Sequence, residues 1–177
     1  TDIWDDDEIC SALASREKGV HHSVSIAIHG SHERHREITH GGDLDRTLKT
    51  IRKLSSSGVT VYANVVIGGD HPVTGAVESA HLALEAGAWD IVVMRACQVR
   101  RTDAEKQRAA DTYVGGVTRL VLREAIEQIS VMAKQFKEET HRGSGFVTLA
   151  CSTPKCIVKD LEGLVVPRGC ACGSKTV

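Results

Sequence analysis

The chain alternates between short apolar runs and amphipathic stretches. Runs rich in Val and Ile, which are typical of strands, occupy residues 23–28, 59–67, 90–95 and 146–150. Apolar residues spaced three and four apart predict helices over residues 5–18, 44–56, 74–86 and 117–139. Gly19, Gly58 and Gly87 follow the first three helices, where glycine favours a helix end. We expect a polar loop over 31–43 and a polar, irregular segment over 96–116.

The order of these elements predicts a parallel sheet. Successive strands are about 30 residues apart, the usual size of a strand–helix–strand unit, and such units place their strands parallel with right-handed crossovers. The run 59–67 is almost continuously apolar, which predicts a strand covered on both faces. A (β/α) barrel and an open doubly wound sheet both fit this pattern. In either fold the chemistry lies at the carboxyl ends of the strands.

Three polar residues near those ends are candidates for contact with a ligand. His29 follows the first strand, Asn64 lies inside the second, and Arg95 ends the third. Asn64 is expected to be buried, where an amide needs a hydrogen-bond partner. The alternatives are a polar loop residue for His29, a backbone partner for Asn64 and a surface salt bridge for Arg95.

Histidines and cysteines raise the question of a metal. The spacing of His32, His35 and His40 fits no common metal template, and we expect His35 to anchor its loop. Four of the six cysteines fall in the last 27 residues, and of these Cys156 and Cys170 are the metal candidates, because thiolates hold iron–sulfur clusters. Zinc or free thiols are the alternatives. Cys10 and Cys97 are expected to be packing residues.

Composition limits the classes of partner. The chain of 177 residues is 41% hydrophobic and 25% charged, with a formal net charge of -1. This charge gives no electrostatic reason to expect nucleic acid. No apolar run approaches about 20 residues, so we expect no membrane span. The first residues are acidic, so we expect no secretory signal and a cytoplasmic location. Because the chain begins with Thr1, we expect that it starts inside a longer gene product.

Several motifs, taken in order, resemble the middle of radical S-adenosylmethionine (SAM) enzymes that carry auxiliary iron–sulfur clusters near the C-terminus. The matching elements are Ala27-Ile28-His29-Gly30, His35, Gly42-Asp43-Leu44, Gly58-Val59-Thr60-Val61, Asn64-Val65-Val66-Ile67, Ala86-Gly87-Ala88, Pro154-Lys155-Cys156 and Cys170-Ala171-Cys172-Gly173. The resemblance covers nearly the whole chain and is weakest over 98–116.

The resemblance implies an α/β fold: a partial (β/α) TIM-type barrel with parallel strands and a short Cys-containing C-terminal extension. It implies a central barrel part over 1–116, the last barrel helix and strand over 117–150, and the start of an auxiliary iron–sulfur region over 151–177. The implied cofactors are SAM, near His29, Asn64 and Arg95, and a [4Fe–4S] cluster. The implied reaction of the parent enzyme is reductive SAM cleavage followed by hydrogen abstraction from a small-molecule or peptide substrate.

One departure limits this expectation. The family's Cys-x-x-x-Cys-x-x-Cys motif, which holds the catalytic cluster, is absent from this sequence. We therefore expect a truncated, inactive piece of a radical SAM enzyme, with an auxiliary cluster at Cys156 and Cys170. Exposed strand edges would favour self-association. The alternatives are a TIM-barrel aldolase, a metal-dependent hydrolase, or a non-catalytic SAM-binding remnant. No strand that we identify ends in Lys, which disfavours an imine mechanism.

Overall fold

The architecture is a mixed α/β fold built on a parallel sheet. We describe it from a computed structural model over residues 7–15, 22–67, 73–95, 119–149 and 165–167. The sheet has five parallel strands in the order β1-β2-β3-β4-β5, so each strand pairs with its predecessor in the sequence. The strands are β1 (Ser23–Ile28), β2 (Thr60–Ile67), β3 (Asp90–Arg95), β4 (Val147–Leu149) and β5 (Val165–Pro167). The prediction of a parallel α/β sheet is confirmed.

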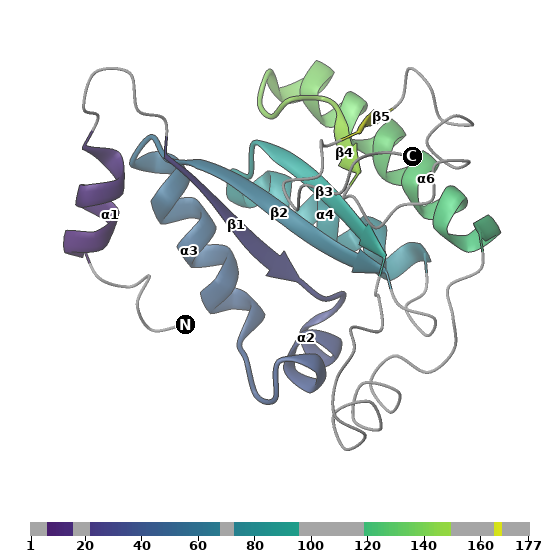
Figure 1. Cartoon of the computed structure of the whole chain (residues 1–177), viewed down its shortest axis with the longest axis horizontal. Helices are drawn as coiled ribbons and strands as arrows, with labels where there is room; N and C mark the ends of the chain where they lie inside the picture. Colours follow the sequence, from purple (N-terminus) through teal and green to yellow (C-terminus); the bar gives the residue numbers. More distant parts are fainter. Residues whose placement is uncertain (1–6, 16–21, 68–72, 96–118, 150–164, 168–177) are drawn as a thin grey trace, which may run out of the picture.

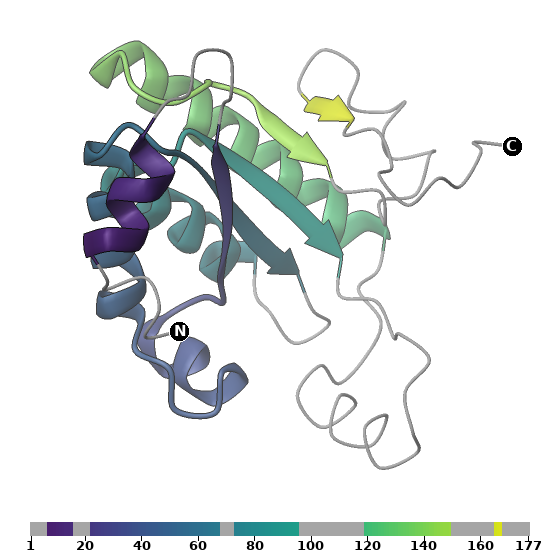
Figure 2. The same ribbon diagram turned by 60° about the vertical axis from the view of Figure 1, so that its left-hand side comes forward.

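Three long helices pack against one face of this sheet: α3 (Leu44–Ser56), α4 (Val73–Ala86) and α6 (Arg119–Thr140). Figures 1 and 2 show them gathered on the same side, with the short helix α1 (Asp7–Ala14) beside α3. The apolar stripe predicted for α3 is buried, and so is the stripe predicted for α6. Each large side chain buried in this layer contributes about 1.5–3 kcal/mol.

The opposite face of the sheet carries no helix among the described residues. The even-numbered positions of β2 are half-buried there, whereas its odd-numbered positions are fully buried against the helices. In β1, Ser23, Ser25 and Ala27 are exposed on the same open face. The prediction that β2 is covered on both faces is therefore confirmed on the helix side, whereas the other face is only half-buried. Side chains alternate along a strand, and only one set of them meets the helix layer.

The segment 31–43, predicted as a loop, contains the helix α2 (His32–Ile38). Ser31 caps this helix by accepting a hydrogen bond from the Arg34 backbone N–H, and Arg34 forms an ion pair with Glu37 one turn on. The helix has no apolar stripe, and its one buried side chain is His35. The loop prediction is wrong because it was based on the lack of an apolar stripe. The helix is stabilised instead by its Ser31 cap and by the buried His35.

Three helices end in the same left-handed motif, in which two backbone N–H groups bond back to the last turn. Gly58 takes the left-handed position after α3, and Gly87 takes it after α4, so both predicted helix ends are confirmed. After α2 the position is occupied by His40, with φ of 56°. The N–H groups of His40 and Gly41 bond to the carbonyls of Glu37 and Arg36. His40 thus adopts a conformation that glycine adopts more easily.

A buried carboxylate ties β3 to β4 at the amino-terminal edge of the sheet. Asp90 is 6% exposed and accepts hydrogen bonds from the Ile91 backbone N–H (2.8 Å), the Ser144 hydroxyl (3.1 Å) and the Thr148 hydroxyl (2.5 Å). Ser144 lies in the turn between α6 and β4. Asp90 therefore fixes the turn and the strand that follows it.

Some predicted features fall partly or wholly outside the described residues. The irregular segment 96–116 lies outside them, as do the ends of the predicted helix 5–18. The strand predicted over 146–150 is found as Val147–Leu149, while Phe146 before it is 55% exposed. The strand β5 was not predicted; it lies within 151–177 and pairs with β4. In the described residues, no helix combines the length and apolar character that a membrane crossing requires.

Candidate functional site

The carboxyl ends of β1, β2 and β3 lie at one edge of the sheet. Ile28, the last residue of β1, pairs with Val65, and Arg95 at the end of β3 pairs with Ile67. His29 follows directly after β1, so it lies near the carboxyl end of the neighbouring strand β2. Figure 1 shows these strands pointing the same way, with α2 beyond the tip of β1. This edge is where a ligand would be expected in a parallel α/β fold.

His29 is held by His35. The backbone N–H of His29 donates a hydrogen bond to Nδ1 of His35 (3.4 Å), and the two rings lie 5.7 Å apart at 43°. His35 is 3% exposed and His29 is half-buried. The expectation that His35 anchors its segment agrees with these contacts, although the segment is a helix rather than a loop.

The second ring nitrogen of His35 contacts α3. Its Nε2 lies 3.4 Å from the hydroxyl oxygen of Thr47, and that hydroxyl donates its proton to the Asp43 carbonyl (3.0 Å). Since a threonine hydroxyl has a single proton, its oxygen accepts from His35 Nε2–H. The network therefore assigns the proton of His35 to Nε2 and leaves a lone pair on Nδ1 for the His29 N–H.

The electrostatic surroundings favour this neutral form. Burial lowers the pKa of His35 below its ordinary value of 6.5; the Asp43 carboxylate opposes this shift, and His32 adds to it. His35 is therefore a neutral hydrogen-bonding residue at neutral pH, and it links the end of β1 to the start of α3.

The other two histidines of this segment have separate roles. Nε2 of His32 lies 3.0 Å from an Asp45 carboxylate oxygen in an exposed pair, and His40 ends α2. Within the described ranges, no three His, Cys, Asp or Glu side chains are grouped in a way that could hold a metal ion.

Asn64 lies on the open face of the sheet, between Ala27 of β1 and Val92 of β3. Its side chain is half-buried, so the prediction of a buried amide is wrong. The cause is strand alternation, which directs Asn64 away from the helix layer. Its partner across the β1–β2 pairing, Ala27, has a small side chain.

The remaining candidates are less fully described. Arg95 closes β3 opposite Ile67, and its side chain lies outside what the structure describes. Cys156 and Cys170 also lie outside the described residues, so metal binding there stays a prediction.

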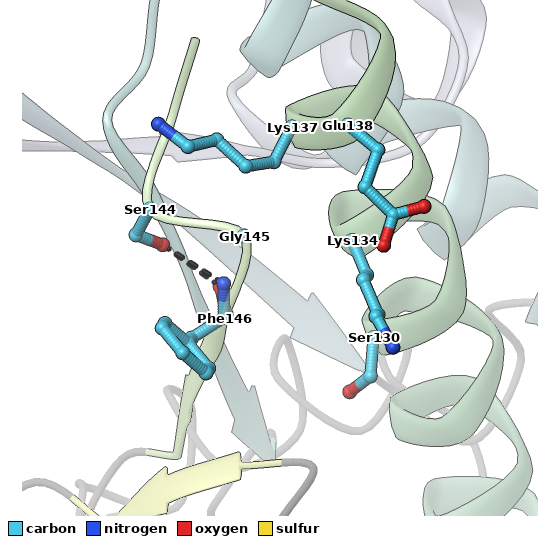
Figure 3. Close-up of a pocket in the computed structure, with 7 residues that line it drawn as sticks. All are labelled: Ser130, Lys134, Lys137, Glu138, Ser144, Gly145 and Phe146. Atoms are coloured by element: carbon cyan, nitrogen blue, oxygen red, sulfur yellow. Dashed lines mark hydrogen bonds between the residues drawn. The ribbon is translucent and has the colours of Figure 1, made fainter. Parts of the chain in front are cut away.

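A shallow pocket of about 270 Å³ opens at the other edge of the sheet, before β4. Figure 3 shows one side of α6 facing the turn that leads into β4, and the lining residues are Ser130, Lys134, Lys137, Glu138, Ser144, Gly145 and Phe146. Lys137 is engaged, since its ammonium donates to the His141 carbonyl (3.3 Å) and lies over the Trp89 ring. The pocket is at the amino-terminal end of β4, away from the edge that carries His29.

Sequence reasoning found His29 but missed its supports. Asp43 caps α3 by accepting from the Asp45 N–H (2.9 Å), and Thr47 follows one turn later. The signal was present: an Asp directly before an apolar-periodic run predicts a helix cap. Nothing in the sequence pattern marks Ser144 and Thr148 as partners of Asp90.

The chain matches no known family model and no curated protein. One solved structure that the chain is weakly similar to is dihydrodipicolinate synthase from Oceanobacillus iheyensis, with 14% sequence identity and a TM-score of 0.35. The match covers 94% of this chain and 61% of that enzyme, so the chain spans about three fifths of its length. A likeness of this size carries no argument about function.

Proposed function

We propose that this chain forms part of the SAM-binding edge of a radical SAM (β/α) barrel, with His29, Asn64 and Arg95 as the contributing residues. One observation carries the proposal. His29 directly follows β1, Asn64 lies in the carboxyl half of β2 and Arg95 ends β3, in three adjacent parallel strands of a sheet whose other face has no helix among the described residues. A barrel strand has helices on its outer side and the barrel interior on the other, and the described sheet has the same asymmetry.

The residue types suit SAM. Its amino-acid part carries a carboxylate, which a guanidinium such as that of Arg95 binds well. Its ribose hydroxyls and its amino group need both donors and acceptors, and the Asn64 amide supplies both. Asn64 is half-buried beside the small Ala27, so a ligand can reach it from the open face.

The same reasoning does not extend to the catalytic cluster. No part of the sequence has the Cys-x-x-x-Cys-x-x-Cys spacing, so this chain by itself offers no matching set of thiolates. We therefore propose that it binds SAM without cleaving it. An auxiliary cluster at Cys156 and Cys170, and a peptide or small-molecule substrate, are further parts of the proposal that the resemblance suggests.

The test is SAM binding by titration calorimetry with the whole chain. Asn64→Ala should weaken binding about tenfold, the effect of one hydrogen bond to a bound ligand. Ser23→Ala is the matched control, because Ser23 is exposed on the same face at the amino end of β1. No measurable binding, or equal affinity in both variants, would contradict the proposal.

The aldolase alternative predicts a different result in the same sample. An imine-forming aldolase needs a reactive lysine at the site, and the described strands contain none. Borohydride reduction in the presence of an α-keto acid should therefore leave the mass of the chain unchanged. A stable covalent adduct on one lysine would favour the aldolase over the SAM site.

A further inference from the structure

We infer that His35 is a positioning residue for the carboxyl end of β1, and that it holds the His29 backbone in place only while its imidazole is neutral. The consequence for ligand binding rests on the proposed function, because the edge that His35 positions is the proposed SAM-binding edge. The coupling between His35 and His29 stands on the contacts alone.

The first step concerns the proton on Nδ1. In the neutral form that the network assigns, Nδ1 is the acceptor for the His29 N–H. Protonation would put an N–H on Nδ1, opposite another N–H, because both nitrogens of the imidazolium are donors. The hydrogen bond would be lost, while Nε2 could still donate to Thr47. Protonation of His35 would therefore break its hydrogen bond to His29 after β1 and keep its hydrogen bond to Thr47 of α3.

The second step concerns the groups that face this ring. The His35 ring contacts the His29 ring at the end of β1. Two further titratable groups act on its pKa: His32 of the same helix and Asp43 at the start of α3. Asp43 is the group that would stabilise an imidazolium. It is exposed, and one of its oxygens is already engaged by the Asp45 N–H. Asp45 is in turn paired with His32.

The third step concerns what else holds α2. This helix has seven residues, and His35 is its buried residue. Side chains of α2 also make contacts at its surface: the Ser31 cap, the Arg34–Glu37 ion pair, whose glutamate is exposed, and the pair between His32 and Asp45 of α3. An exposed pair such as His32–Asp45 contributes about 0–1 kcal/mol. Loss of the His35 bond would therefore loosen the link between β1 and α2.

The decisive experiment is a pH titration of the whole chain, labelled with ¹⁵N, by NMR. Long-range ¹H–¹⁵N spectra read the tautomer of His35, and the backbone amide of His29 reports on the bond. We expect the Nε2–H tautomer at neutral pH, a midpoint for His35 below 6.5, and a shift of the His29 amide that follows this midpoint. An Nδ1–H tautomer, or a His29 amide that does not respond at the His35 midpoint, would overturn the inference.

Two variants separate the positioning role from a general structural role. His35→Asn keeps a side-chain acceptor near the position of Nδ1 and cannot titrate, so the His29 amide should stay bonded and lose its pH response. His32→Gln removes an exposed histidine of the same helix and should leave the response in place. A response that survives His35→Asn would also overturn the inference.

SAM binding then tests the consequence. From one pH unit above to one pH unit below the His35 midpoint that the NMR titration measures, we expect the affinity of the unaltered chain to fall by up to about tenfold, as for the loss of one hydrogen bond, and that of His35→Asn to change less. If neither protein binds SAM at either pH, the proposed function fails, and the NMR titration still decides the role of His35.

Discussion

Asp90 should be one of the most important polar residues for stability, although it is far from the candidate site. Its carboxylate is buried and accepts three hydrogen bonds, from Ile91, Ser144 and Thr148. The perturbation of choice is Asp90→Ala, which removes both acceptor oxygens and leaves the Ile91 N–H and the two hydroxyls to find new partners. Asp90→Asn is the matched control, because it preserves shape and one acceptor oxygen while the hydroxyls can rotate.

The expected loss follows from these bonds. A hydrogen bond to a charged group contributes about 1.5–3 kcal/mol, and the cost of burying the carboxylate offsets part of the sum. We therefore expect Asp90→Ala to lower the free energy of unfolding by about 3 kcal/mol and Asp90→Asn to lower it by about 1 kcal/mol. For a chain of this size, about 3 kcal/mol corresponds to a fall in Tm of about 6–12 °C.

Urea unfolding followed by circular dichroism measures the effect, and an unchanged m-value would show that the unfolded state is not altered. The double variant with Thr148→Val should lose about 1–2 kcal/mol less than the sum of the single variants, because both remove the same bond. A loss below about 1 kcal/mol for Asp90→Ala, or strict additivity with Thr148→Val, would refute the assignment.

Four further outcomes follow from the fold and the site. His40→Gly should raise the free energy of unfolding by about 0.5–1 kcal/mol, because glycine adopts the left-handed conformation more easily; a thermal melt would detect it, and a lower Tm would contradict it. Gly87→Ala should cost about 2–3 kcal/mol, since φ is 106° and a Cβ would lie 2.7 Å from the Ser55 hydroxyl oxygen; the same melt checks it, and a neutral result would contradict the close approach. The free energy of unfolding should fall as the pH drops below 6.5 and level off below the lowered pKa of His35, because in this range the unfolded chain takes up a proton that the folded chain does not. Denaturation measured from pH 8 to 5 should show a His35 contribution of at most about 1.4 kcal/mol per pH unit. This contribution should be absent in His35→Asn. Anaerobic reconstitution with iron and sulfide should load about one cluster and Cys170→Ala should abolish it, as thiolate ligation requires; iron counts that do not change would leave the C-terminal thiols without this role.

Elements with strong apolar periodicity could be predicted from the sequence. The bounds expected for β1, β3 and α3 agree with the structure, because each has a regular pattern and a clear end, such as Gly58 after α3. The helix α2 could not be predicted in the same way. Its stability comes from the Ser31 cap, an ion pair and a buried polar residue, and none of these produces a hydrophobic stripe.

The candidate site was predictable only as a location. Strand order and direction indicate that the residue after β1 lies at the carboxyl edge, so His29 could be identified as a candidate. The partners of His35 depend on how α2 folds back onto α3, which brings Thr47 next to a residue twelve positions earlier. Asn64 was expected to be buried because it lies inside an apolar run. The sequence does not indicate which face of a strand the helices cover, and only the arrangement of α3, α4 and α6 shows it.

The strand order has a consequence for how the chain assembles during synthesis. Each strand of the described sheet lies beside the one made just before it, so none of these five strands has to wait for a partner encoded far downstream. A nascent chain can therefore close the β1–β2 pair, cover it with α3 and α4, and add β3 and β4 in turn as they leave the ribosome. Addition at a growing edge means that each new strand closes a loop only to the strand made just before it, which is a shorter loop than a pairing with an earlier strand would require.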